Sequence, residues 1–133
     1  MNPPSKHQTW VEIDLNQLEK NLRFLRQNLR PETKIMAVVK ADAYGHGAVG
    51  VAVCLLRCGA DALAVSSVEE GRELRQGGVK APILVLGEVT VDLVEELAKH
   101  GLIASVSDLQ LLSRLNSLGK RLRQKIETHI KFD

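Results

Sequence analysis

Hydrophobic and polar positions follow one another along the chain in two distinct patterns. The first pattern spaces leucines three and four residues apart over residues 13–31, which predicts an amphipathic helix that Asp14 caps and Pro31 stops. The second pattern is the continuous apolar run at residues 34–40, which is typical of a strand covered on both faces in a parallel sheet. These residues therefore predict a helix followed by a buried strand.

The two patterns recur through the rest of the sequence. Further helices are predicted at residues 47–59, 67–78, 90–101 and 107–119, and further strands at 61–65, 82–86, 102–106 and 125–133. Capping boxes open two of these helices, Ser67 with Glu70 and Ser107 with Gln110. Successive strands begin about 20 to 26 residues apart, which predicts parallel βα units joined by right-handed crossovers.

Two α/β folds fit this order of elements. One is an open doubly wound sheet of flavodoxin type. The other is the first part, about five of eight strands, of a (β/α)8 barrel of TIM type, which needs about 250 residues when complete. The last predicted strand favours the barrel, because Glu127, His129 and Lys131 form a polar stripe opposite an apolar face. Such a stripe would face a ligand pocket or elements that this sequence does not contain.

Composition and charge narrow the class of protein. The 133 residues are 44% hydrophobic and 26% charged, which predicts a single globular unit with a substantial core. The 18 basic and 16 acidic residues give a net charge of +2 and are mixed along the chain, without the basic face that nucleic-acid binding needs. Aromatic residues, at 3%, are too few for the stacking platforms of single-strand binders.

Cysteine usage and hydropathy point to a protein of the cytoplasm. Cys54 and Cys58 lie one helical turn apart in an apolar segment and have no histidine at zinc-like spacing, so we expect reduced core thiols and no metal. No apolar run reaches the roughly 18 residues of a membrane span. The first ten residues also lack the charged-then-apolar order of a signal peptide.

The candidate chemistry is concentrated at residues 38–47, "VVKADAYGHG", where a strand runs into a lysine. A strand-end lysine is in most proteins only the point where the strand reaches water. Here, however, Lys40 is followed by Tyr44 and by two glycines, Gly45 and Gly47, that allow a tight turn before the next helix. Ligands of both candidate folds bind at the carboxyl ends of strands, and helix N-termini favour anions. An amine, a phenol donor and a phosphate-binding turn together predict a pyridoxal phosphate site.

The same stretch resembles the cofactor-lysine motif of the alanine racemases. The resemblance extends over the whole chain, since "TWVEIDLNQLEKNLRFLR" is similar to the opening of that family, "ILVLGE" to its third-strand segment and "THIKFD" to its "HLKxDTGMGRLG" segment. The lysine motif is highly specific, and the other three segments are weak signals by themselves. The resemblance implies a pyridoxal phosphate-dependent isomerase that interconverts L- and D-alanine, supplies D-alanine for the cell wall and acts as a homodimer.

The resemblance also implies roles for individual residues. Lys40 would hold pyridoxal phosphate covalently and act as one of two catalytic bases, and Tyr44 would bind the cofactor phosphate. Val38 and Leu86 would line the cofactor pocket, although plain core packing explains each equally well. Lys131 matches a position that is carbamylated in several members of the family, and its alternative is an ordinary polar side chain inside the barrel. His46 is interpreted as part of the turn.

Family members are more than twice as long as this sequence. The arginine near the pyridine nitrogen, the later phosphate ligands, the substrate-binding arginine and the second catalytic base, a tyrosine of the partner subunit, have no counterpart here. We therefore expect residues 1–133 to be the N-terminal part of the barrel domain, without the remaining half-barrel and β-domain, and to be inactive alone. Two alternatives stay open: a non-catalytic pyridoxal phosphate-binding protein of the same barrel class, and a small flavodoxin-like binding module.

Overall fold

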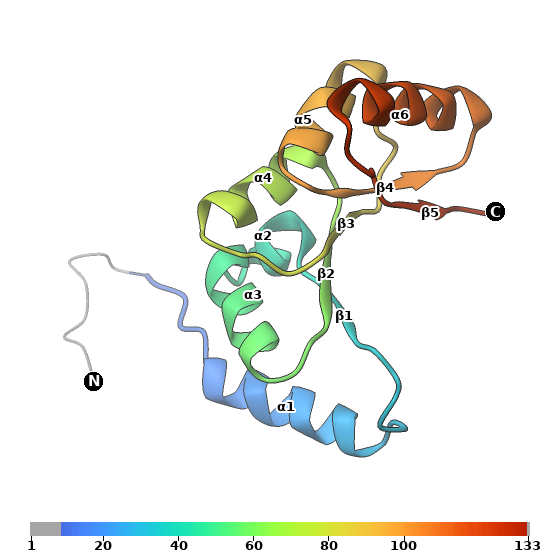
Figure 1. Ribbon diagram of the computed structural model, residues 1–133. Helices are drawn as coiled ribbons and strands as arrows, with labels where there is room; N and C mark the ends of the chain where they lie inside the picture. The colour runs from blue at the N-terminus through green and yellow to red at the C-terminus, as the bar shows by residue number, and fades with distance from the viewer. Residues whose placement is uncertain (1–8, 133) are drawn as a thin grey trace.

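The fold, seen in a computed structural model that describes residues 9–132, is a curved parallel sheet with helices on one side (Figure 1). Within these residues, five parallel strands pair in the order β1-β2-β3-β4-β5. The strands are β1 (Met36–Val38), β2 (Ala62–Val65), β3 (Ile83–Val85), β4 (Ile103–Val106) and β5 (Thr128–Ile130). The helices are α1 (Leu15–Gln27), α2 (Lys40–Gly45), α3 (Ala48–Arg57), α4 (Val68–Gln76), the 3-10 turn η1 (Val91–Leu93), α5 (Val94–Lys99) and α6 (Leu109–Leu122).

The strand order decides between the two predicted folds. Each strand pairs with the strand that precedes it in the sequence, as in the wall of a (β/α)8 barrel. A flavodoxin-type sheet has the order 2-1-3-4-5, so that alternative is wrong. The prediction of parallel βα repeats that form the first part of a barrel wall is confirmed.

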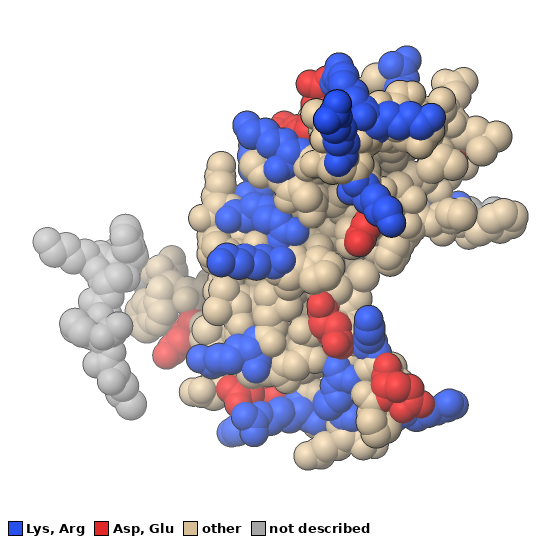
Figure 2. Space-filling view, viewed as in Figure 1, with Lys and Arg blue, Asp and Glu red and all other residues tan. Residues whose placement is uncertain are grey.

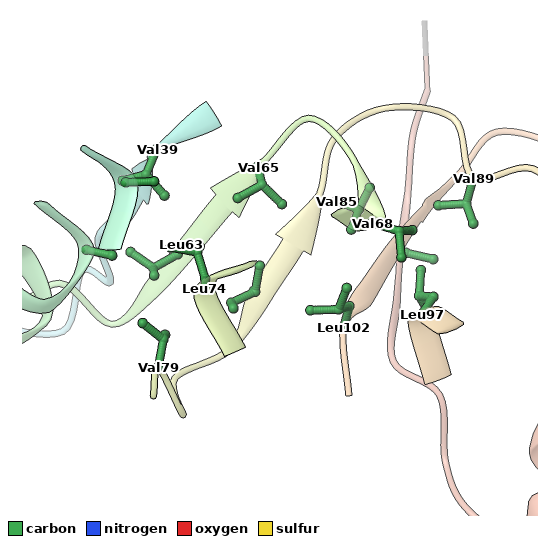
Figure 3. Packing of buried hydrophobic residues seen from close by; sticks show 14 of the residues in the cluster. Val39, Leu63, Val65, Val68, Leu74, Val79, Val85, Val89, Leu97 and Leu102 are labelled. Carbon is green, nitrogen blue, oxygen red and sulfur yellow. The ribbon is translucent and has the colours of Figure 1, made fainter. Parts of the chain in front are cut away.

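The main core lies between the sheet and the helices (Figure 3). Alternate strand residues such as Leu63 and Val85 are buried against helix residues such as Leu74 and Leu97. The opposite face of the sheet carries a smaller cluster, which consists of Ala64, Leu84 and Ile103 with Leu86 packed on it. The helices lie on one side of the curved sheet, so this smaller buried cluster lies on its concave face (Figure 1).

The first helix is confirmed, but only part of its leucine stripe is covered. The Asp14 carboxylate accepts hydrogen bonds from the amides of Asn16 and Gln17, as the predicted cap requires. Of the stripe, Leu22 is buried, whereas Leu25 is 56% exposed. The reason is that α1 packs mainly on α3, so only the part of the stripe that faces α3 is covered.

Both edge strands are shorter than predicted. The apolar run at 34–40 forms a strand only over Met36–Val38, and the run at 125–133 only over Thr128–Ile130, with Asp133 outside the described residues. The central strand β3, predicted over 82–86, also forms over only three residues, so the shortening is not confined to the edge strands. The predicted alternation in the last strand is retained. Thr128 and Ile130 pair with Ala104 and Val106, which belong to the main core, whereas His129 pairs with Ser105 on the other face of the sheet.

One capping box was placed wrongly. The N-cap of α6 is Asp108, whose carboxylate accepts from the amides of Gln110 and Leu111 at 2.7 and 2.9 Å, so the predicted pair of Ser107 and Gln110 does not form. A carboxylate caps a helix at least as well as a hydroxyl, and Asp108 lies one residue nearer to the helix. The capping box of α4 forms in part, since the Glu70 amide donates to the Ser67 hydroxyl at 3.4 Å.

The cysteines and the surface charge agree with the sequence pattern. Cys54 is buried and Cys58 half-buried; both are free thiols, and burial raises the pKa of Cys54. No helix between residues 9 and 132 combines the length and apolarity of a membrane span. Basic side chains lie from the α1 end of the molecule to the α6 end with acidic groups between them, on the face shown in Figure 2.

Candidate functional site

Lys40 lies at the carboxyl edge of the sheet, where β1 gives way to α2. Its predecessor Val39 is buried and still belongs to the sheet, because the Val39 amide donates to the carbonyl of Ala64 at 2.8 Å. The Lys40 side chain is half-buried and makes no hydrogen bond or ion pair within the described part of the chain. The unpaired amine of Lys40 therefore lies at the carboxyl end of the sheet, where barrel enzymes bind their ligands.

The backbone after Lys40 turns in the left-handed sense. The φ angles of four consecutive residues, from Ala41 to Tyr44, lie between 50° and 56° although none of them is glycine. Left-handed helical geometry costs L-residues about 1–2 kcal/mol each, so this turn requires support from its surroundings. Gly45 and Gly47 also have positive φ, 80° and 86°, which confirms the turn that the glycines predict.

Asp42 closes the turn onto the next helix. The Val39 carbonyl accepts from the Ala43 amide, and the Asp42 carbonyl accepts from the Gly47 amide, both at 3.0 Å. The Asp42 carboxylate accepts from the Ala48 amide, the first in α3, at 2.6 Å. The expectation that the start of α3 is available to an external anion is therefore wrong for this amide, because the chain supplies its own carboxylate.

Glu70 supports the turn from outside. Its Oε1 accepts from the Ala41 amide at 2.8 Å, and its Oε2 accepts from the amide and hydroxyl of Ser66 at 2.7 and 2.8 Å. Burial alone would raise the pKa of Glu70, but hydrogen bonds from Ser66 and Ala41 outweigh it and lower the pKa. The carboxylate thus joins the ends of β1 and β2 as an ionised acceptor.

The other predicted site residues also lie at or near the carboxyl ends of strands, but on different strands and in different surroundings. Tyr44 is 59% exposed, and with Val38 it lines an open cleft of about 430 Å³ beside the start of α1. Neither Lys40 nor Leu86 lines this cleft. Leu86 follows β3 and packs on the concave face, as core packing predicts. Lys131 follows β5, and its amide donates to the Val106 carbonyl at 2.8 Å.

The structure therefore brings some predicted residues together and leaves others apart. Lys40 and Tyr44 share one turn, and the register Val38–Ala64–Leu84 puts Val38 on the same sheet face as the cluster that holds Leu86. Lys131 lies at the opposite edge of the sheet. Between residues 9 and 132 no group of three or more histidine, cysteine or acidic residues is arranged to hold a metal ion.

Comparison with known proteins identifies the family to which this architecture belongs. A family profile described as "Alanine racemase, N-terminal domain" matches residues 13–133. The chain belongs to the alanine racemase family. Among curated relatives, the alanine racemase of Symbiobacterium thermophilum is 46% identical over 125 residues, which cover 94% of this chain and 33% of that protein. The alanine racemase of Halothermothrix orenii is 44% identical over all 133 residues and 35% of its own length. The chain thus spans about a third of these alanine racemases.

Solved alanine racemases show the same fold. The enzyme of Clostridium difficile 630 in complex with cycloserine matches 98% of this chain with a TM-score of 0.94 and 40% identity, and the match covers 35% of that protein. The Bacillus anthracis enzyme with bound L-Ala-P matches 98% of this chain with a TM-score of 0.85 and 33% identity, again over about a third (34%) of its length. The predicted resemblance to the alanine racemases is confirmed.

Two residues that shape this candidate site were missed by the sequence reasoning. Asp42 lies six residues before Ala48, too far for a cap of ordinary spacing, and only the left-handed turn brings it to α3. Glu70 was recognised as a capping-box residue, but its contact with Ala41 spans 29 residues of sequence and leaves no local signal. A helix-start glutamate near the end of a strand is the one pattern that could have pointed to it.

Proposed function

We propose that the natural polypeptide that carries this chain is a pyridoxal phosphate-dependent alanine racemase. It would interconvert L- and D-alanine in the cytoplasm, as a homodimer, and so supply D-alanine for peptidoglycan. The observation that carries this proposal is the unpaired, half-buried amine of Lys40 at the carboxyl end of β1, in a chain of the alanine racemase family.

The donor set of the chain fits pyridoxal phosphate. The cofactor aldehyde needs an amine free of ion pairs, and Lys40 has none within residues 9–132. The phosphate needs donors, and the exposed Tyr44 hydroxyl has no partner in the same part of the chain. The ring needs an apolar surface, which Val38 and Leu86 offer beside the concave face. These four residues would hold the cofactor.

Each of these residues has a defined task in the proposed reaction. Pyridoxal phosphate supplies an electron sink for negative charge at the substrate Cα. Lys40 Nζ would accept or return the Cα proton on one face of the substrate, the D-alanine side, as a general base or acid. The acid–base group for the opposite face would come from the partner copy, from sequence beyond this chain. Lys131 remains a candidate for carbamylation, which would orient an arginine downstream.

Two measurements on the natural polypeptide test the proposal. Borohydride reduction after addition of pyridoxal phosphate, followed by peptide mapping, should place the label on Lys40 and not on Lys34 or other exposed lysines. Chromatography of the alanine enantiomers should then show conversion of L-alanine to D-alanine. Label spread evenly over surface lysines would reject the site. Label on Lys40 without conversion would leave a non-catalytic cofactor-binding protein.

A further inference from the structure

The left-handed turn after Lys40 needs an anchor that the turn itself does not provide. Four consecutive non-glycine residues hold φ angles of 50–56°, a region that such residues normally avoid. The internal hydrogen bonds of the turn satisfy the amides of Ala43 and Gly47 but not that of Ala41, the residue directly after Lys40. Glu70 Oε1 accepts from the Ala41 amide at 2.8 Å. The anchor is therefore attached next to the candidate catalytic lysine.

The anchor continues across the sheet edge. Glu70 Oε2 holds the amide and hydroxyl of Ser66, at the end of β2, and the Ser66 carbonyl accepts from the Gly87 amide at 3.1 Å. A Cβ on Gly87 would lie 2.3 Å from the Ser66 carbonyl oxygen, so only glycine permits this approach. One line of hydrogen bonds thus joins the ends of β1, β2 and β3. Lys40 directly precedes Ala41, and Leu86 directly precedes Gly87; the amides of Ala41 and Gly87 both belong to this line of hydrogen bonds.

Glu70 is itself held in place by the helix on which it lies. It belongs to the first turn of α4, where its amide donates to the Ser67 hydroxyl of the cap. One residue later, a Cβ on Gly71 would meet Leu102 Cδ1 at 2.7 Å, so α4 lies closely against the chain that leads into β4. The opposite end of α4 is held by Arg75, whose guanidinium donates to the carbonyls of Val79 and Ala81, both at 2.8 Å. The carboxylate therefore projects from the end of α4 that the Ser67 cap and the contact with Leu102 hold, and Arg75 acts at the far end of the helix.

We propose that Glu70 is a positioning residue, which sets the orientation of Lys40 by holding the left-handed turn to the end of β2. This inference rests on the proposed function, because the orientation matters for attachment of pyridoxal phosphate and for proton transfer at Cα. Glu70 touches neither substrate nor cofactor in this account. It acts through the backbone of Ala41.

Glu70→Gln is the informative substitution. A carboxylate can accept from all three donors, whereas a glutamine amide offers one acceptor oxygen and places an NH2 group against at least one backbone N–H. Glu69→Gln is the matched control, because it makes the same change one residue earlier at a carboxylate that interacts with the Ser67 hydroxyl of its own helix cap. Ser66→Ala is a milder second variant, which removes one of the three donors and retains the Ser66 amide.

The first readout is amide hydrogen exchange of the peptide 40–47 in the natural polypeptide without cofactor. We expect exchange about tenfold faster in Glu70→Gln, the size that the loss of one hydrogen bond to a charged group produces, and unchanged exchange in Glu69→Gln. The second readout is titration with pyridoxal phosphate, monitored by the absorbance of the reducible Lys40 link. Its apparent dissociation constant should rise about tenfold in Glu70→Gln, with kcat reduced more than KM changes.

The outcomes separate this inference from the proposed function. Unchanged exchange at 40–47 in Glu70→Gln, or altered exchange with unchanged cofactor affinity and kcat, would overturn the positioning role. If exchange is faster in Glu70→Gln but the wild-type protein attaches no pyridoxal phosphate, the proposed function would be overturned, and Glu70 would remain only the anchor of the turn. Should Glu70→Gln fail to fold, Ser66→Ala takes its place. In Ser66→Ala, amide exchange of residues 40–47 should be about threefold faster and the apparent dissociation constant for pyridoxal phosphate about threefold higher; the absence of these changes would overturn the inference.

Discussion

The two ends of the sheet are stabilised by opposite chemistry. At the amino ends of the strands, Arg26 donates to the carbonyls of Thr33 and Gly59, and Arg75 donates to four carbonyls in the segments before β3 and β4. At the carboxyl ends, carboxylates of Asp42 and Glu70 accept from backbone amides.

The direction of the helices explains this difference. Each helix runs back antiparallel to the strands, so helix carbonyls point to the amino end of the sheet and helix amides to the carboxyl end. Cations therefore suit one end and anions the other, and Asp61, a carboxylate at the amino end, accepts from Arg26 as well as from the Ile35 amide. At the amino end, Arg26 and Arg75 donate to backbone carbonyls, whereas at the carboxyl end the half-buried amine of Lys40 makes no hydrogen bond or ion pair within residues 9–132. We therefore expect substitutions at the amino end to affect mainly stability, and the proposed chemistry to take place at the carboxyl end.

Lys40→Ala should give the largest effect and should act at the carboxyl end alone. A positioned acid–base group contributes about 10²–10⁴-fold to a rate, so conversion of L-alanine by the natural polypeptide should fall by at least that factor. The urea midpoint should stay unchanged, since Lys40 has no partner among the described residues. The control is Lys34→Ala, at an exposed lysine before the same strand. Retained turnover in Lys40→Ala would remove Lys40 from catalysis.

Arg75→Ala should have the converse effect, with a large loss of stability and an intact site. The guanidinium donates at 2.8–3.1 Å to the carbonyls of Val79, Ala81, His100 and Gly101, and hydrogen bonds to charged groups contribute about 1.5–3 kcal/mol. We expect the free energy of unfolding to fall by about 2–4 kcal/mol in urea denaturation.

The control for Arg75 is Arg72→Ala on the same helix. Arg72 makes one half-exposed ion pair with Glu96, so its removal should cost no more than about 1 kcal/mol. Folded Arg75→Ala should bind pyridoxal phosphate as the wild type does. An equal fall in cofactor affinity would show that the two ends are not independent.

Tyr44→Phe tests whether a second residue at the carboxyl end of the sheet binds the cofactor without contributing to stability. The hydroxyl has no partner in residues 9–132 and the residue is 59% exposed, so its loss should leave the unfolding midpoint unchanged. A lost hydrogen bond to a charged phosphate should weaken pyridoxal phosphate binding by about 10- to 100-fold in a spectroscopic titration. Pyridoxal without its phosphate serves as the control ligand, and its affinity should not change.

The smallest effect is expected from Asp61 at the amino end. Hydrogen bonds from the Ile35 amide and from Arg26 lower the pKa of this carboxyl below its value in the unfolded chain. A lowered pKa contributes stability above the unfolded pKa, and this contribution is lost as pH falls through the folded pKa. Asp61→Asn should therefore be less stable than wild type near neutral pH and approach it below about pH 4. A constant difference down to the lowest pH would contradict this cause.

The elements with strong periodicity could be predicted from the sequence, and the site only in part. The helix after Asp14, the central strands and the βα order follow from apolar spacing and caps, which are local properties. The left-handed turn could not be predicted, because Ala41 and Ala43 favour right-handed helix and only tertiary contacts reverse them. Lys40 could be proposed as a site residue because its motif is local and specific, and Glu70 was missed because its contact with Ala41 is not local.

The contact between Ala41 and Glu70 also sets an order of events during synthesis. The two residues are 29 positions apart, so when Lys40 is added to the growing chain the segment that fixes its turn has not yet been made. Until β2 and the first turn of α4 have docked, residues 41–44 have no external reason to leave the ordinary right-handed region. The nascent chain thus carries its candidate catalytic lysine on an unformed turn, and the reactive geometry is completed only after the scaffold around it has folded.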